Sequence, residues 1–210
     1  MPYANEGSIM NQNNPVTKYF DDYCENKVMH PLLIGAVKYV GPNPVYYCFQ
    51  MSSRMDYANN PIETIGYELL KPYQNVKYNY YEKSTKVVHC SNIHILSKER
   101  MEQCNMMGYL TPGTNKTLRS IATRHLFFQD QGFAPADIAT DDFFSLIGVT
   151  KEELRQSEDY KYYAAYASNQ AFEEAVQERR NEAKRITRIY LDVVREYMSD
   201  FKEKTSGMKR

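Results

Sequence analysis

The sequence predicts a mainly α-helical protein with one small β-hairpin. Three Asn-Pro pairs, beginning at Asn14, Asn43 and Asn60, punctuate the first half, and each precedes a stretch that can be helical. Asparagine caps the free N–H groups of a helix start, and proline is tolerated at the first helical position. The stretch from Ser157 to Lys204 contains neither proline nor glycine. We therefore expect a bundle of short helices followed by a long C-terminal helix.

These patterns divide the 210 residues into four parts. We expect a polar N-terminal arm at 1–14, a short-helix domain at 15–156 with a hairpin near 76–90, the long C-terminal helix at 157–204, and a tail at 205–210. A chain of this length can hold one domain of ordinary size, or a smaller domain with an extension.

Four short helices are expected in the first third of the chain. They cover residues 15–26, 30–40, 45–55 and 60–71. Gly41-Pro42 ends the second helix, and Glu63 completes a capping box with Asn60 at the start of the fourth. A strand competes with the helix over Val45 to Gln50, because aromatic and β-branched residues are dense there.

The hairpin is the one predicted β-structure. Val76, Tyr78 and Tyr80 alternate with polar residues, residues 82–85 can form a turn, and Lys86 to Cys90 can return. An isolated hairpin is only marginally stable in water. We therefore expect this one to lie on the helices or on a partner.

More helices are expected after the hairpin. Ser97 caps a short helix that Gly108 ends, and residues 115–128 form an amphipathic helix. Thr140 is expected to cap a further helix that ends at Gly148.

The helix start at Thr150 has the strongest local signature. Glu153 completes a capping box, and Val149 can face Leu154 as a hydrophobic staple. The helix, glycine turn and capped helix also follow the rhythm of a DNA-reading helix-turn-helix. Glu152 and Glu153 would then face phosphates, so their charge disfavours DNA reading, and we favour a helix hairpin used in packing.

The long C-terminal helix carries an apolar seam that begins at Val176 and continues at steps of three or four residues. A continuous helix of this length would reach about 70 Å, more than the diameter of a small domain, so part of it must project or lie against another chain. Its last part has a wide apolar face, which we take as the candidate partner interface: Ile186, Ile189, Tyr190, Val193, Tyr197 and Phe201. The alternative is that this face packs against the chain's own short helices.

Composition limits the classes of partner. Lys plus Arg and Asp plus Glu both total 26, so the formal net charge is zero, which disfavours wholesale binding to nucleic acid or to anionic membranes. No apolar run is long enough to span a bilayer, and the start lacks the features of a secretory signal or transit peptide. We expect an intracellular protein, with mitochondrial import without a cleaved presequence as an option.

Catalytic motifs are missing from the sequence. There is no Gly-x-Ser-x-Gly, no P-loop and no dinucleotide fingerprint, so no cofactor is expected. The four irregularly spaced cysteines are expected to be free and mostly buried thiols. A metal-binding module or a soluble enzyme is the alternative, because His89, Cys90, His94 and Cys104 carry suitable donor atoms within a short stretch.

These observations favour a non-catalytic accessory subunit of a large intracellular multiprotein assembly. The 19 tyrosines support contact surfaces, since tyrosine combines a large apolar ring with a polar tip. A mitochondrial accessory subunit or a virion component would fit this description, with other protein subunits as partners. A third possibility is a nucleic-acid binder that uses Lys116, Arg119 and Arg124.

Overall fold

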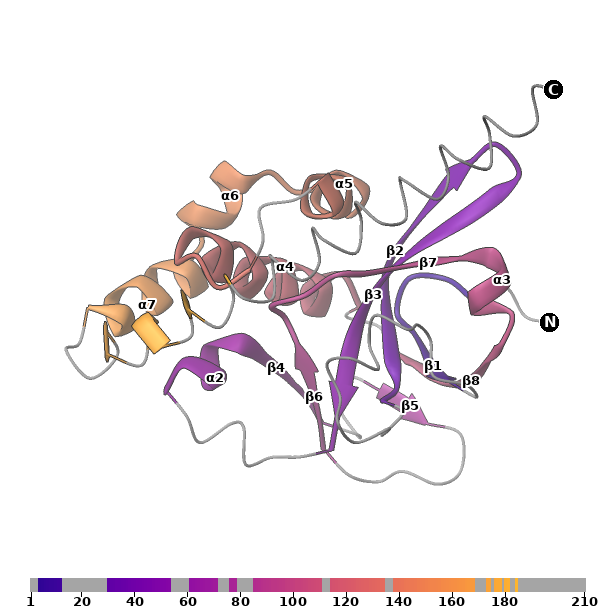
Figure 1. Cartoon of the computed structure of the whole chain (residues 1–210), viewed down its shortest axis with the longest axis horizontal. Coiled ribbons are helices and arrows are strands. Elements are labelled where there is room, and N and C mark those ends of the chain that lie inside the picture. Colours follow the sequence, from indigo (N-terminus) through magenta and orange to yellow (C-terminus); the bar gives the residue numbers. More distant parts are fainter. Residues whose placement is uncertain are drawn as a thin grey trace, which may run out of the picture.

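The protein is built on an antiparallel β-sheet with most of its described helices packed on one side of it (Figure 1). The computed structural model describes residues 4–12, 30–53, 61–71, 76–78, 85–110, 114–134 and 138–168, and also 173, 174, 176–178, 180, 181 and 184. None of the helices in these residues is long and apolar enough to cross a membrane.

Eight strands within the described residues form the sheet, and every pairing is antiparallel. They are β1 (Ser8–Gln12), β2 (Leu32–Val40), β3 (Asn43–Ser52), β4 (Tyr67–Leu70), β5 (Val76–Tyr78), β6 (Lys86–His89), β7 (His94–Ser97) and β8 (Cys104–Leu110). Seven follow the order β4-β6-β3-β2-β1-β8-β5, and β7 pairs with β3. The long strand β3 therefore has β2 on one edge, and β6 and then β7 along the other.

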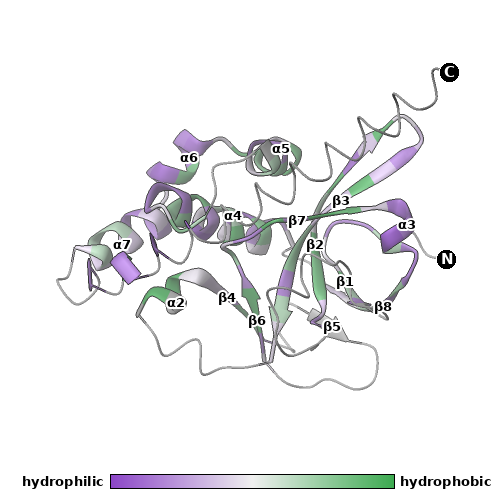
Figure 2. Ribbon diagram, viewed as in Figure 1, coloured by the Kyte–Doolittle hydropathy of each residue, from purple (hydrophilic) through white to green (hydrophobic). Residues whose placement is uncertain are grey.

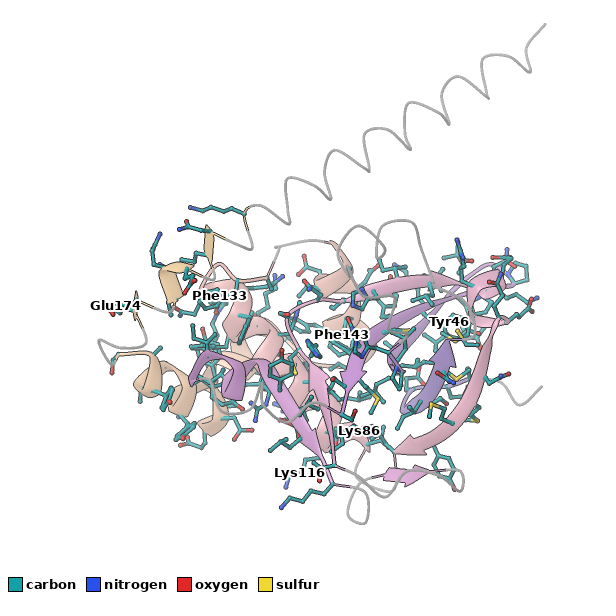
Figure 3. The ribbon with its side chains drawn as sticks, turned by 60° about the horizontal axis from the view of Figure 1, so that its bottom comes forward. Tyr46, Lys86, Lys116, Phe133, Phe143 and Glu174 are labelled. Atoms are coloured by element: carbon teal, nitrogen blue, oxygen red, sulfur yellow. The ribbon has the colours of Figure 1, made fainter. Side chains whose placement is uncertain are left out.

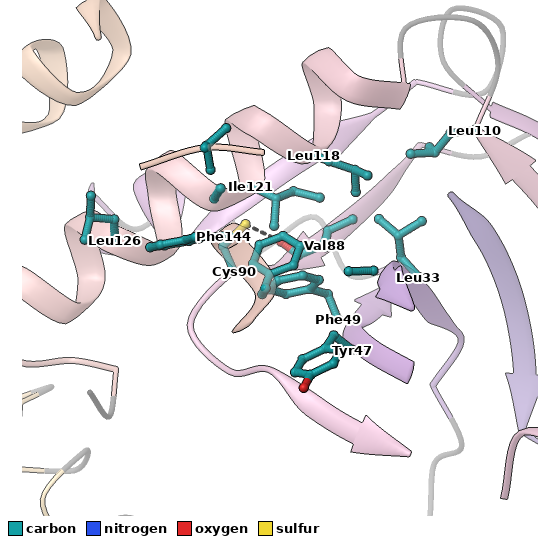
Figure 4. Packing of buried hydrophobic residues seen from close by; sticks show 14 of the residues in the cluster. Leu33, Tyr47, Phe49, Val88, Cys90, Leu110, Leu118, Ile121, Leu126 and Phe144 are labelled. Carbon is teal, nitrogen blue, oxygen red and sulfur yellow. Dashed lines mark hydrogen bonds between the residues drawn. The ribbon is translucent and has the colours of Figure 1, made fainter. Parts of the chain in front are cut away.

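Six helices are described. They are α2 (Pro61–Gly66), α3 (Lys98–Met101), α4 (Thr114–Asp130), α5 (Ile138–Leu146), α6 (Lys151–Gln156) and α7 (Glu158–Ala167). The longest, α4, buries Leu118, Ile121 and Leu126 against the sheet in one core cluster with Leu33 and Phe49 (Figure 4). On its other side α4 contacts α6 and α7.

Both faces of β2 and β3 are buried at the centre of the sheet. Leu33 and Phe49 face the α4 side, whereas Leu32, Ile34 and Cys48 belong to a second core cluster on the other side, which includes Met101 of α3. Figure 2 shows hydrophobic residues on both strands at this centre. Double burial removes the alternation of apolar and polar residues that marks a half-buried strand.

The prediction of a mainly helical protein with one small hairpin is wrong. The expected helices at 30–40 and 45–55 fall on β2 and β3, so the competing strand interpretation of Val45 to Gln50 was the better one. A continuous apolar run cannot be assigned to helix or strand by periodicity alone. Gly41-Pro42, taken as a helix stop, is the turn between the two strands, where Val40 pairs with Asn43.

The expected polar arm at 1–14 contains a sheet strand. Residues 8–12 form β1, which lies between β2 and β8, and Ile9 and Met10 are buried. The expected helix at 15–26 lies outside the described residues. Because polar residues flank the apolar pair on both sides, the sequence pattern did not indicate a strand here.

The hairpin expected near 76–90 is also wrong in its pairing. Both of its strands exist as β5 and β6, but β5 pairs with β8 and β6 pairs with β3 and β4. Gly108, expected to end a helix, lies inside β8. The helix expected at 60–71 ends at Gly66, where β4 follows. These elements are fixed by distant partners rather than by local turns.

The helical half agrees better with expectation. The helix expected at 115–128 is α4, and the capping box of Thr150 and Glu153 is confirmed. Thr140, expected as a cap, lies inside α5. The helix that Ser157 caps, α7, ends at Ala167, and helical residues recur between 173 and 184.

Candidate protein-binding surfaces

The four potential metal ligands do not come together. The thiol of Cys90 lies in the α4-side core and donates to the Val88 carbonyl (3.4 Å), whereas Cys104 lies in the cluster on the other side of the sheet. His89 packs against the ring of Tyr67, with 4.4 Å between ring centroids. Across the described residues no three potential ligand side chains lie close enough to share a metal ion.

The buried thiols of Cys48 and Cys90 are poor nucleophiles. Burial raises the pKa of Cys90 to about 12 and raises that of Cys48 even further. A thiol with such a pKa is protonated at neutral pH, and the thiolate is the reactive form. Cys48, Cys90 and Cys104 are all free.

His125 of α4 is buried in the core, and both of its ring nitrogens have hydrogen-bond partners. Its Nδ1 lies 2.6 Å from the carbonyl oxygen of Cys90 and its Nε2 lies 2.8 Å from the hydroxyl of Thr140. Because a carbonyl only accepts, Nδ1 carries the hydrogen, and a neutral ring then accepts the Thr140 hydroxyl at Nε2. Gln129 donates to the same hydroxyl oxygen. This buried chain joins α4, α5 and the end of β6, and it serves packing.

A carboxylate fixes α5 to the sheet. Asp142 accepts hydrogen bonds from Lys38 at 2.8 and 2.9 Å and from the hydroxyl of Tyr47 at 2.6 Å. These two donors lower the pKa of Asp142. Lys38 pairs with Val45 and Tyr47 pairs with Ala36, so the two donors lie on one face, diagonally across the β2–β3 ladder. Their contacts with Asp142 hold α5 against the projecting hairpin.

The charged residues considered for nucleic-acid binding do not form a positively charged surface together. Lys116 and Arg119 are exposed, but Arg124 is held by Glu68 (3.0 Å) and stacks over Tyr163. The expected second helix of a helix-turn-helix is the six-residue α6, which exposes Glu152 and is anchored by buried Leu154. These residues support the helix-hairpin interpretation.

The first candidate surface lies on α7. One side of this helix is anchored, because Tyr160 and Tyr163 meet Phe127 edge-on, at 5.6 and 5.7 Å between centroids. On another side Tyr162 is 65% exposed and Tyr166 39% exposed, and their rings stack at 6.4 Å with an interplanar angle of 27°. We call Tyr162, Ala165 and Tyr166 the α7 tyrosine face; all three are exposed.

The second candidate surface is the hairpin arm, defined as Ala36 to Tyr47. It extends from the body at the end of the molecule opposite α7 (Figure 1). Near its tip Tyr39 is 65% exposed and Val40 is 59% exposed. Figure 3 shows the same separation, with Tyr46 on the side of the sheet and Phe133 among the helices near α7.

The predicted interface at the C-terminus is not tested. Ile186, Ile189, Tyr190, Val193, Tyr197 and Phe201 lie outside the described residues. Val176, where the expected seam begins, is buried in one cluster with Phe127, Phe133 and Tyr163. Arg180 donates to the Gln131 carbonyl at 2.6 Å. The start of the seam is therefore core.

No family model matches this chain, and no curated protein matches it.

Proposed function

We propose that this chain is a non-catalytic accessory subunit of a large intracellular assembly and that the α7 tyrosine face binds a neighbouring subunit. The stacked pair of Tyr162 and Tyr166 on a helix whose other side is locked into the core carries the proposal. A rigid helix that presents two aromatic rings to solvent has the form of a protein-binding surface.

The chemistry of the α7 tyrosine face suits a protein partner. Tyrosine offers a large contact area at low conformational cost, and each hydroxyl can accept or donate a hydrogen bond. The two rings already stack on each other, so their side chains lose less conformational entropy on binding. We propose a partner surface that is apolar in the centre and carries a hydrogen-bonding group for the Tyr162 phenol.

Charge argues against nucleic acid as the ligand of this face. Bases stack on aromatic side chains when a positively charged groove also holds the backbone. The first turn of α7 instead exposes Glu158 and Asp159, and Lys161 pairs with Glu158 at 2.7 Å. The alternative of an enzyme or metal module loses support because His89, Cys90, His94 and Cys104 are dispersed.

The C-terminal segment is a second proposed contact. Ile189 and Val193 belong to the apolar face expected there. If the face binds a partner, Ile189→Asp with Val193→Asp leaves the chain folded and abolishes that binding. Loss of cooperative unfolding in this variant would assign the face to the core instead. An intracellular location, mitochondrial or in a virion, is likewise a proposal, which free thiols support.

Site-specific photo-crosslinking tests the α7 contact. A photoreactive phenylalanine analogue replaces Tyr162 in the chain expressed in its natural source. We expect one defined adduct with another protein species. The matched control places the same analogue at Asn115, an exposed residue of α4, and should give none. Equal adduct patterns from both positions, or no adduct at Tyr162, would refute the proposal.

A further inference from the structure

The two edges of the hairpin arm are protected differently. On the β3 edge, β7 pairs as far as Ser97 opposite Val45, and the next residue toward the tip is Pro44, which has no N–H to offer. On the β2 edge, β1 pairs only up to Leu33. Among the described residues no strand pairs with this edge from Ala36 to Val40. Proteins use proline to blunt sheet edges, so one edge is blunted and the other is not.

Hairpin geometry shows which groups point away from the arm on the β2 edge. Val40 and Asn43 flank the two-residue turn, so they form a hydrogen-bonded pair. Antiparallel ladders alternate, so Lys38 and Ala36 also turn their backbone groups toward β3. Val37 and Tyr39 therefore direct their N–H and C=O groups outward.

The root of the arm supports this assignment. The N–H of Gly7 donates to the carbonyl of Ile34 at 2.7 Å, so Ile34 also faces away from β3. The register shifts between Ile34 and Ala36, which leaves Gly35 as the extra residue of a bulge. A bulge changes the alternation by one residue, as the opposite directions of Ile34 and Ala36 require.

We propose that the chain forms a homodimer in which the β2 edges of two copies pair antiparallel about a two-fold axis at Lys38. Val37 of each copy then lies opposite Tyr39 of the other. Both residues direct their backbone groups outward, so each pair exchanges two hydrogen bonds and four form in all. A β-branched residue beside an aromatic one is a favourable cross-strand pair.

Charge permits a second copy as the occupant. The pairing places Lys38 opposite Lys38 of the other copy, and like charges in that position would repel. Each Lys38 already binds Asp142 at 2.8 Å, which compensates its charge. The chain has a formal net charge of zero, so two copies have no overall repulsion. This contact uses the end of the molecule opposite the α7 tyrosine face and does not depend on it.

Sedimentation equilibrium of the full-length chain tests the pairing. We expect reversible dimerisation between about 1 μM and about 500 μM. Tyr39→Pro removes the outward N–H and leaves the β2–β3 ladder intact, as Pro44 does across the hairpin. It should raise the dissociation constant at least about tenfold, because two symmetry-related hydrogen bonds disappear. Tyr39→Phe keeps the N–H and the ring and should change the constant less than about threefold.

A second variant tests the register without altering the edge. Asp142→Ala leaves Lys38 uncompensated, so dimerisation should weaken at low salt and recover at high salt. Circular dichroism and thermal unfolding check that each variant is folded. A monomer at every concentration, or a Tyr39→Pro variant that dimerises like the parent, would overturn the proposal. A salt-independent effect of Asp142→Ala would overturn the register at Lys38.

Discussion

The β2–β3 hairpin has two ends with opposite environments. At its base Leu33 and Phe49 are fully buried between α4 and the sheet, and the alternate residues Ile34 and Cys48 are buried on the other side. At its tip Tyr39 and Val40 are mostly exposed. The same two strands therefore serve as core at one end and as surface at the other.

Stability and binding should therefore depend on different residues of this chain. Residues at the base should determine the free energy of unfolding and should not determine partner choice. Residues at the arm tip, and those of the α7 tyrosine face, should do the reverse. The following substitutions compare the buried base of the hairpin with its exposed tip.

The largest effect is expected at Phe49. Phe49→Ala removes a fully buried ring that meets Phe143 edge-on at 5.0 Å, and the resulting cavity should cost about 3–5 kcal/mol of unfolding free energy. Tyr39→Ala at the tip should cost less than about 0.5 kcal/mol. Urea denaturation measures both. Equal losses at the two positions would contradict the division between base and tip.

Low pH should reduce the free energy of unfolding through His94, which lies at the base of the hairpin opposite Cys48. Burial lowers the pKa of His94 from 6.5 to about 4, so between these values the unfolded chain binds a proton that the folded chain does not. The contribution is fully present above pH 6.5 and is lost as the pH falls toward 4, by up to about 3 kcal/mol. His94→Gln should flatten the dependence of unfolding free energy on pH in this window, and an unchanged profile would contradict the assignment.

A side chain added at Gly35, in the bulge of β2, should reduce the unfolding free energy by an intermediate amount. A Cβ at Gly35 would lie 2.8 Å from Cε2 of Phe49 and 2.9 Å from the ring of Phe143. Gly35→Ala should therefore cost about 1–3 kcal/mol through overpacking. Adding Phe49→Leu shortens one obstructing side chain, so the double variant should lose less than the sum of the two single changes. Strict additivity in a double-mutant cycle would rule out the contact as the cause.

The smallest change in unfolding free energy is expected where Asp142 contacts the hairpin arm. Asp142→Asn weakens the contacts with Lys38 and Tyr47, and the partial exposure of Lys38 limits the loss to about 1 kcal/mol or less. Because these donors lower the pKa of Asp142, its contribution is present above pH 3.8 and disappears as the pH falls through the lower folded value. Asp141→Asn, at a more exposed ion pair with Lys151, is the matched control and should change the thermal midpoint less.

Local signals in the sequence could be read, and non-local pairing could not. The capping box of Thr150 and Glu153 and the cap at Ser97 depend on residues three positions apart, and the structure has both. β5 and β6 were recognisable as strands, but their partners come from β8, β3 and β4. The burial of both faces of β2 and β3 removed the alternating pattern that would have distinguished them from helices.

The candidate surfaces show the same limit. The density of tyrosines after Ser157 was visible, yet only the packing of Tyr160 and Tyr163 on Phe127 reveals that Tyr162 and Tyr166 are the exposed pair. The arm could not be anticipated once its strands were taken for helices. Its open edge follows from pairing with β1 and β7, which no local pattern specifies.

Native mass spectrometry of the tagged chain isolated from its natural source tests whether the α7 tyrosine face binds a neighbouring subunit. The parent chain is compared with Tyr162→Ser plus Tyr166→Ser, two changes at exposed positions that should leave the unfolding free energy nearly unchanged. We expect the parent in a large particle with other proteins and the variant released from the neighbour that crosslinks at Tyr162. A parent chain recovered without other proteins, or a variant that keeps every neighbour, would show that the α7 tyrosine face does not bind a subunit.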